Sequence, residues 1–267
     1  MKRYSMALYE AFTDVPFGGS QAAVITDAAS IDAPKRQRIA REIGMPATAF
    51  VDAYGDDWVQ VQFLSTVMEL PMCGHGTLCL LTHLLETGRV QAGRDIELRL
   101  PSSRANVSVS VVNGGRFRVM LDIVAPVFEQ APAQPNDLLS CLGVGADALS
   151  CDLPLETARG DFVHLIVPIA GLDAMRALKP DFNAMIGYCH SHGIETIAAF
   201  CLETEDPVRQ LHVRDFCPAV GVSESAAAGT TNAALSSYLL RHAVIAATAE
   251  TVVLAEQGIE LGRPSSI

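Results

Sequence analysis

The sequence has few basic residues. Of its 267 residues, 19 are Lys or Arg and 30 are Asp or Glu, which gives a net charge of −11 and an isoelectric point near 5.0. Nucleic acids are bound through basic surface, so this charge balance argues against a nucleic-acid partner. The Gly-X-Gly patterns at 74–76 and 143–145 lack the further spacing of a dinucleotide-binding fingerprint. We therefore expect no nicotinamide cofactor.

Long apolar segments are also missing. No stretch approaches the length of a membrane span, and the apolar part of the N-terminal MKRYSMALYEAF is short and contains Glu10. The seven cysteines form no Cys-X-X-Cys pair, and their number is odd. Without a secretory signal, such cysteines are expected to be free thiols in a reducing compartment. The sequence thus predicts a cytoplasmic protein without membrane association.

What the sequence does contain is enough apolar material for a large core. Hydrophobic residues make up 49% of the chain, and the mean hydropathy is +0.26. The segment APVFEQAPAQP, with three prolines and no clear period, interrupts the pattern of strands and helices. We place a domain boundary there, with an N-terminal half over residues 1–124 and a C-terminal half over residues 125–267.

The most informative stretch is MELPMCGHGTLCLL, over residues 68–81. It follows the alternating strand pattern VQVQFLS and precedes an amphipathic helix predicted over about residues 77–85. A thiol, an imidazole, two glycines and a hydroxyl that could cap the helix meet at this joint, in Cys73, Gly74, His75, Gly76 and Thr77. The first turn of a helix carries unpaired N–H groups and partial positive charge, which suit a carboxylate. We therefore predict one wall of a site for a small acid.

The same order of elements occurs twice. A strand, a loop with a Glu, a run of small residues and a helix follow one another around Cys73–Thr77 and again around Ala228–Thr231. This repetition suggests a duplication in which two helix N-termini face one ligand.

Five motifs resemble the PhzF family, in the order in which that family carries them. They are FTDVPFGGSQAAV, IAREIGMPATAFV, FLSTVMELPMCGHGTL, HLIVPIAGLDAMRALKPDF and VGVSESAAAGTTNAALSSYL. This family is the phenazine-biosynthesis isomerase-like branch of the diaminopimelate epimerase fold. The resemblance implies an α/β (α+β) protein of two pseudo-symmetric halves, each a curled, mostly antiparallel sheet around a central helix, with the active site between them. It also implies cofactor-independent proton transfer on a small carboxylic acid and, commonly, a homodimer.

Several positions depart from the family pattern. The proton-transferring Glu of the family's Ser-Glu-Thr motif is Ala47, the Asp of its later Glu-Asp-Pro motif is Ser225, and its Gly-Asn-Pro motif has Ser20 in place of Asn. In the epimerase and proline racemase relatives two cysteines face each other. Cys73 matches the first and Ala228 the second, so two-base racemisation, which needs a proton-transferring group on each face, is not expected.

The candidate catalytic residues are His75 and Cys73. The unperturbed pKa of His lies near neutrality, and helix N–H groups could lower the pKa of Cys73. The competing interpretations are a helix-start histidine that binds backbone and a small, inert buried thiol. The candidate substrate-binding residues are Gly74, Gly76, Thr77, Gly229, Thr230, Thr231, Ser20 and Ser225.

Three carboxylates near these motifs are further candidates. For Glu69 and Glu224, pairing within the loop or backbone capping is the favoured interpretation. Asp215 could replace a missing carboxylate, but a solvated strand residue or a partner of Arg214 is favoured. Cys189, His190 and His192 are spaced so that they do not converge on a metal ion, and no second cluster completes a zinc site. We expect neither a metal nor another cofactor.

The favoured function is an isomerase or tautomerase that moves a proton on a small carboxylic acid. Two alternatives remain open. One is a binding protein that kept the acid site and lost the chemistry, as the residues Ala47, Ser225 and Ala228 suggest. The other is a dehydratase of a hydroxy acid such as a hydroxyproline, since the MCGHG-type motif is shared with the proline racemase relatives. The sequence does not identify the substrate.

Overall fold

The computed structural model describes residues 3–112, 114, 117–132 and 135–267. Residue contacts divide the chain into two compact units, Met1–Ala11 with Ser20–Ile123 (unit 1) and Phe12–Gly19 with Val124–Ile267 (unit 2). This grouping differs from the division expected from sequence in one segment, because residues 12–19 belong to unit 2 by their contacts. This loop packs with unit 2 because Ser266 N donates to the Phe12 carbonyl at 2.9 Å and the Arg263 side chain donates to the Gly18 and Gly19 carbonyls.

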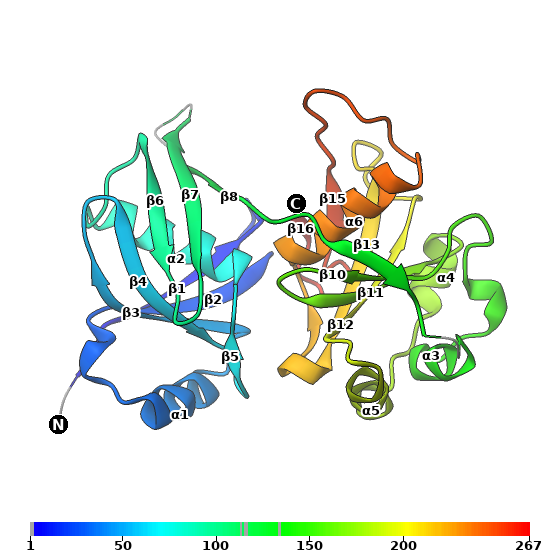
Figure 1. The fold of residues 1–267 in the computed structure, drawn as a ribbon, viewed down its shortest axis with the longest axis horizontal. Coiled ribbons are helices and arrows are strands. Elements are labelled where there is room, and N and C mark those ends of the chain that lie inside the picture. Colours follow the sequence, from blue (N-terminus) through cyan, green and yellow to red (C-terminus); the bar gives the residue numbers. More distant parts are fainter. Residues whose placement is uncertain (1–2, 113, 115–116, 133–134) are drawn as a thin grey trace. The chain divides into compact units, whose positions relative to one another are not determined.

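Unit 1 combines strands with the helices α1 and α2 (Figure 1). Its elements are β1 (Met6–Ala11), β2 (Ser20–Ile25), the 3-10 turn η1 (Ala28–Ser30), α1 (Ala33–Ile43), β3 (Ala47–Tyr54), β4 (Trp58–Leu64), β5 (Glu69–Leu70), α2 (Gly74–Glu86), β6 (Arg94–Arg99), β7 (Arg104–Val111) and β8 (Phe117–Leu121). Asp32 caps α1, because its Oδ1 accepts from Lys35 N at 3.0 Å.

The strands of unit 1 form one sheet in the order β1-β2-β3-β4-β6-β7-β8, and β5 pairs with β4. Helix α2 contacts β1, β2 and β3 and also β8 at the far edge. One helix that reaches both edges of a sheet requires that the sheet curl around it. Leu80, Leu81 and Leu84 are fully buried on α2 and supply the apolar face for this packing.

Unit 2 has more helices. Its elements are β9 (Val127–Gln130), α3 (Pro135–Leu142), η3 (Ala146–Ala148), β10 (Glu156–Arg159), β11 (Val163–Pro168), α4 (Leu172–Ala177), α5 (Phe182–His192), β12 (Thr196–Cys201), β13 (Leu211–Cys217), η4 (Pro218–Val220), β14 (Val222–Ser225), α6 (Gly229–Arg241), β15 (Ala255–Gln257) and β16 (Ser265–Ser266). The sheet order is β16-β15-β13-β12-β11-β10-β9, with β14 on β13.

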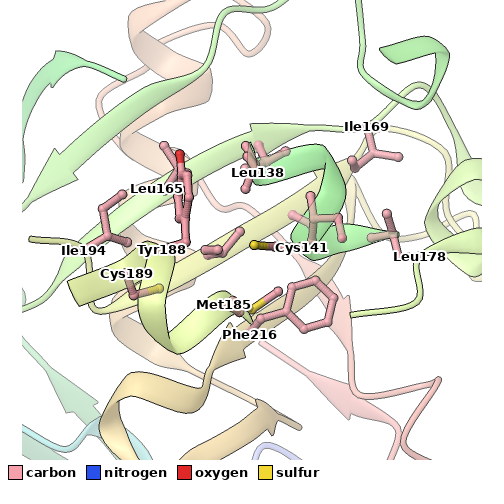
Figure 2. Close-up of a cluster of buried hydrophobic side chains, with 14 of the residues drawn as sticks. Leu138, Cys141, Leu165, Ile169, Leu178, Met185, Tyr188, Cys189, Ile194 and Phe216 are labelled. Carbon is pink, nitrogen blue, oxygen red and sulfur yellow. The ribbon is translucent and has the colours of Figure 1, made fainter. Parts of the chain in front are cut away.

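Both faces of this second sheet are covered. On one face, Leu235, Tyr238 and Leu239 of α6 pack on side chains of β11, β12, β13 and β15. On the other face, α3, α4 and α5 contribute a second cluster, in which Met185 and Cys141 approach Phe216 of β13 (Figure 2). Burial on both faces explains why β12, with the sequence TIAAFC, has no exposed residue.

The two units share one topology. In unit 1, β2–β3 and β4–β6 are parallel, whereas β1–β2, β3–β4, β4–β5 and β6–β7 are antiparallel. In unit 2, β11–β12 and β13–β15 are parallel, whereas β10–β11, β12–β13, β13–β14 and β15–β16 are antiparallel. Helix α2 therefore corresponds to α6. The repeat inferred from sequence is present in the structure, because the order and direction of strand pairing are the same in both units.

Some local expectations need correction. The helix predicted from about residue 77 begins at Gly74, so Cys73 is its N-cap and Thr77 lies inside it. Strands β7 and β8 pair antiparallel, and residues 113, 115 and 116 between them lie outside the described residues. Among the residues that the structure describes, no helix has the length and apolar character needed to cross a membrane.

Candidate functional site

The N-terminus of α2 is open. Its N-cap, Cys73, has extended backbone angles (φ −145°, ψ 96°), and its carbonyl accepts from Thr77 N at 2.8 Å. The Cys73 side chain makes no capping hydrogen bond. The first N–H groups of the helix thus keep their capacity to bind an anion.

Cys73 and His75 are adjacent at this end of α2. The thiol is 4% exposed, the imidazole is half-buried, and Cys73 Sγ lies 3.8 Å from both Nδ1 and Nε2 of His75. Burial raises the pKa of Cys73 to about 12, although the Gly76 backbone N–H opposes this effect. The helix N–H groups therefore do not lower the pKa of Cys73 below its ordinary value, because loss of hydration outweighs them.

Loss of hydration also lowers the pKa of His75, to about 4. At neutral pH the imidazole is uncharged, with one nitrogen that can accept a proton. Since charge on the ring is disfavoured by missing hydration, an anionic ligand at the helix N-terminus would raise this pKa. The imidazole is thus prepared to become a base when an anion binds.

The glycine at position 76 keeps this turn compact. A Cβ added there would lie 2.7 Å from Cys73 Sγ and 3.0 Å from the Phe63 ring. A side chain at this position would force one of these two neighbours to move, which a closely packed core resists, and glycine avoids both contacts. Thr77, predicted to bind substrate, is fully buried, and within the described part of the chain its hydroxyl has no hydrogen-bond partner.

The N-terminus of α6 repeats the backbone geometry of α2. Its N-cap, Ala228, has φ −136° and ψ 107°, and no side chain caps it. Gly229 and Thr230 are half-buried, and Thr231 is 1% exposed. Here the position equivalent to Cys73 carries a methyl group in place of a thiol.

The two glutamates near these helices bind other protein groups. Glu224 accepts from Arg214 Nε at 2.9 Å and from Nη2 at 2.8 Å, and both side chains are buried. Glu69 accepts from Gln62 Nε2 at 2.6 Å. These contacts match the structural interpretation of both residues. Arg214 is therefore the partner of Glu224 and not of Asp215.

Asp215 is the residue for which the structure differs most from expectation. It was expected to be solvated or paired with Arg214, yet it is 2% exposed. Its Oδ2 accepts from Thr231 Oγ1 at 3.0 Å, and its Oδ1 has no hydrogen-bond partner among the residues that the structure describes. Burial raises its pKa to about 7, against the opposing effect of the Thr231 and Thr196 hydroxyls. A carboxyl that changes charge near neutrality has a property that proton transfer requires.

Two further residues beside Asp215, His164 and Thr196, were not identified as candidates from the sequence. His164 Nδ1 lies 2.6 Å from Thr196 Oγ1 and 3.5 Å from Thr231 Oγ1, and His164 and Thr196 are both buried. Strand alternation could have indicated the face on which Asp215 lies, since Leu211 and Val213 share it. The approach of β11 and β12 could not be foreseen.

The remaining candidates occupy the two units as follows. Ser20 begins β2 in unit 1 and is buried, and Ser225 ends β14 in unit 2, where its hydroxyl donates to the Ala227 carbonyl at 3.2 Å. Among the described residues, no group of three or more His, Cys, Asp or Glu side chains is placed to hold a metal ion.

Comparison with known proteins places this geometry in a family. A family model described as phenazine biosynthesis-like protein, PhzC-PhzF, matches residues 9–267. The chain is 29% identical over 264 residues to trans-2,3-dihydro-3-hydroxyanthranilate isomerase of Pseudomonas fluorescens, covering 98% of this chain and 88% of that one.

Solved structures show the same fold. A PhzF-family phenazine biosynthesis protein of Bacillus anthracis superposes with a TM-score of 0.90 at 24% identity, over 100% of this chain and 89% of that one. A hydroxyproline epimerase of Agrobacterium vitis, with trans-4-hydroxy-L-proline bound, superposes with a TM-score of 0.63 at 13% identity. The superposition covers 93% of this chain and 80% of the epimerase. The fold is thus the diaminopimelate epimerase-like one, as expected from sequence. The chain belongs to the PhzC-PhzF family of phenazine biosynthesis-like proteins, whose relatives include named isomerases.

Proposed function

We propose that this protein is an isomerase that moves a proton within a small unsaturated or hydroxylated carboxylic acid and uses no cofactor. The observation that carries the proposal is the open N-terminus of α2 with a neutral imidazole in its first turn. Helix N–H groups would bind the carboxylate and stabilise the negative charge that develops on it when a neighbouring carbon loses its proton.

His75 would act as the base in this mechanism. Its pKa of about 4 in the free protein makes it a weak base. A bound carboxylate would raise that pKa, because an anion nearby favours the imidazolium form. Binding of the acid thus prepares the base that acts on it. Cys73, whose pKa is raised, would remain a thiol and would shape the site beside the imidazole or return a proton from the neutral form.

The uncapped N-terminus of α6, with Gly229 and Thr230, offers the same kind of anion site in unit 2. That both units serve one substrate, and that the protein is a cytoplasmic homodimer, stay predictions from sequence. The named relative acts on trans-2,3-dihydro-3-hydroxyanthranilate, a small unsaturated hydroxy acid, and we propose acids of that class as substrates.

Solvent isotope exchange tests the proposal. The protein is incubated in D₂O with trans-2,3-dihydro-3-hydroxyanthranilate and, separately, with trans-4-hydroxyproline. Proton NMR then reports deuterium at carbon, and mass spectrometry reports any loss of water. We expect deuterium incorporation without loss of water, and a decrease of about 10²-fold or more in His75→Ala. Matched controls are His190→Ala, an exposed histidine on α5, and Cys189→Ala, a buried thiol in the other unit.

The outcomes separate the alternatives. Loss of water would identify a dehydratase. Binding of the acids without exchange would identify a binding protein, an alternative favoured by the raised pKa of Cys73 and the lowered pKa of His75. Deuterium exchange that persists in both His75→Ala and Cys73→Ala would show that these two residues do not carry out the proton transfer.

A further inference from the structure

A buried imidazole in unit 2 contacts two carboxylates. His212 on β13 is fully buried. Its Nδ1 lies 2.7 Å from Glu256 Oε1, and its Nε2 lies 2.9 Å from Glu260 Oε1. A neutral imidazole has one N–H group and can donate to one of these carboxylates, whereas an imidazolium donates to both. The geometry therefore fits a protonated ring that joins two ionised carboxylates.

The two carboxylates differ in how firmly they are held. Glu256 lies in β15 and is 4% exposed, and its oxygens also accept from the backbone N–H groups of Glu205 at 2.6 Å and Asp206 at 2.9 Å. Glu260 lies in the turn that follows β15, and its Oε2 is buried with no hydrogen-bond partner in the part of the chain that the structure describes. Glu260 therefore depends more on the imidazole than Glu256 does.

The turn that carries Glu260, at residues 258–263, reaches the loop at residues 12–19. The Arg263 side chain ends the turn and donates to the carbonyls of Gly18 at 2.8 Å and Gly19 at 2.9 Å. This loop joins two strands of unit 1 along the chain but packs with unit 2. The turn thus fastens to unit 2 a segment whose two ends continue into unit 1.

Hydrogen bonds from the C-terminal segment carry the position of this loop. A cavity of about 460 Å³ is lined by residues 12–15 of the loop, by residues 205, 206 and 209, and by residues 256, 259 and 264–266. Residues 14–17 of the loop are exposed. Since a cavity borders the loop and solvent covers its middle, little packing fixes these residues. Segments with few buried contacts open locally at low cost in free energy.

We propose that His212, Glu256 and Glu260 form a pH-sensitive latch, in which the imidazolium holds the turn at residues 258–263 on β13 and the turn holds the loop at residues 12–19 on unit 2. When His212 gives up its proton to solvent, one carboxylate faces a lone pair of the ring, and no cation remains between two buried negative charges. The turn then yields, because Glu256 is fixed in a strand and Glu260 is not. This inference does not rest on the proposed function.

The other charged or titratable groups near His212 do not change this pH dependence. Cys201, its neighbour on β12, stays a thiol, because burial raises its pKa to about 12. Arg214 on β13 is bound to another carboxylate, and Arg176 of α4 is bound to Glu205. Both arginines also attract the carboxylate in the turn. An arginine stays charged throughout the accessible pH range, so this attraction is constant.

The direction of the switch follows from the same contacts. Burial by itself lowers the pKa of His212, but the hydrogen bonds and charges of Glu260 and Glu256 outweigh burial and raise the pKa above its ordinary value of 6.5. A raised histidine pKa stabilises the folded arrangement at low pH, and this stabilisation is lost as pH rises through the pKa of the folded state. The latch is therefore closed when the ring is protonated and opens toward alkaline pH.

NMR and limited proteolysis test the latch on the intact chain. Nitrogen-15 NMR of the histidine rings gives the pKa of His212, which we expect above 6.5. Chymotrypsin cleavage after Phe17, an exposed residue of the loop, is then measured at pH values on either side of that pKa. A synthetic peptide of residues 9–22 corrects for the pH dependence of the protease. We expect the ratio of protein to peptide cleavage to rise about tenfold across the titration, as loss of a charge-assisted hydrogen bond implies.

Three variants show which group is responsible. His212→Asn keeps an amide donor near the position of Nδ1 and lacks the nitrogen that reaches Glu260, so its cleavage should be fast at both pH values. Glu260→Gln keeps an acceptor and removes one charge that favours the imidazolium, so its cleavage should accelerate at a lower pH than in the wild type. His190→Ala is the matched control, an exposed histidine on α5, and should behave as the wild type does.

Thermal melting shows which variants are folded, and Glu260→Gln carries the test if His212→Asn does not fold. A His212 that titrates below 6.5 refutes the latch, and so does a wild-type cleavage ratio that stays constant across the titration. An equal rise in His212→Asn also refutes it, because another group would then open the loop. These measurements involve no substrate, so their outcome leaves the proposed function to its own test.

Discussion

Replacing Asp215 with Asn should change how the stability of the protein depends on pH. The pKa of Asp215 rises from 3.8, its ordinary value, to about 7 in the folded protein. The folded state therefore binds a proton that the unfolded state releases between these values. By linkage, ionisation of Asp215 lowers the free energy of unfolding progressively as pH rises from about 4 to about 7, and the loss is complete above that range.

The magnitude follows from the shift. One pKa unit corresponds to about 1.4 kcal/mol, so a shift of roughly three units costs the wild type about 4 kcal/mol at alkaline pH. Roughly 2–3 kcal/mol of this falls between pH 5 and pH 8. Asp215→Asn is close in shape and cannot ionise, so it lacks this dependence. The variant should gain roughly 2–3 kcal/mol of stability relative to the wild type between pH 5 and pH 8.

Urea unfolding of both proteins at pH 5 and pH 8 gives the stability difference between variant and wild type at each pH. The change in this difference between the two pH values reports Asp215, because the other titrating groups contribute equally to both proteins and cancel. Asp173→Asn is the control, because the Asp173 side chain is fully exposed and should show no such gain. A stability difference between wild type and Asp215→Asn that is the same at both pH values would show that Asp215 ionises in the folded protein as it does in water. A gain toward acid pH would show that a cation stabilises it.

Three further predictions concern other contacts. Gly76→Ala should lower stability by about 1–3 kcal/mol in urea unfolding, because the added Cβ meets Cys73 Sγ at 2.7 Å; an unchanged midpoint would show that the turn can open. Glu224→Gln should lower stability by about 3–5 kcal/mol, because it leaves the buried Arg214 charge without its carboxylate; a loss below 1 kcal/mol in the same assay would contradict this. Under native conditions a thiol reagent should label one cysteine rapidly, Cys151, since the other six are buried; rapid labelling that persists in Cys151→Ser would show that a buried thiol is accessible.

Much of the local structure follows from the sequence. The Asp32 cap, the prolines that interrupt the chain after residue 124, and the small residues before each central helix are local signals, and they predict helix starts and a repeated strand–loop–helix unit. The ordered motifs also indicate the family and, through it, the fold. Helix N-termini without a capping side chain are visible in sequence as well, because Cys73 and Ala228 cannot cap as Ser or Asp does.

Tertiary structure decided the chemistry of the site. Whether Cys73 is a thiolate, whether His75 is charged and whether Asp215 is solvated all depend on how much water the fold removes from each group, and no local pattern reports this. Burial raises the pKa of the Cys73 thiol, keeps the His75 imidazole neutral, and raises the pKa of Asp215, a strand residue expected to face solvent, to about 7. The sequence by itself supplied these residues and their family. Only the pairing of distant strands brought Asp215, Thr231, Thr196 and His164 together beneath one helix, because such pairing places in contact residues that lie far apart along the chain.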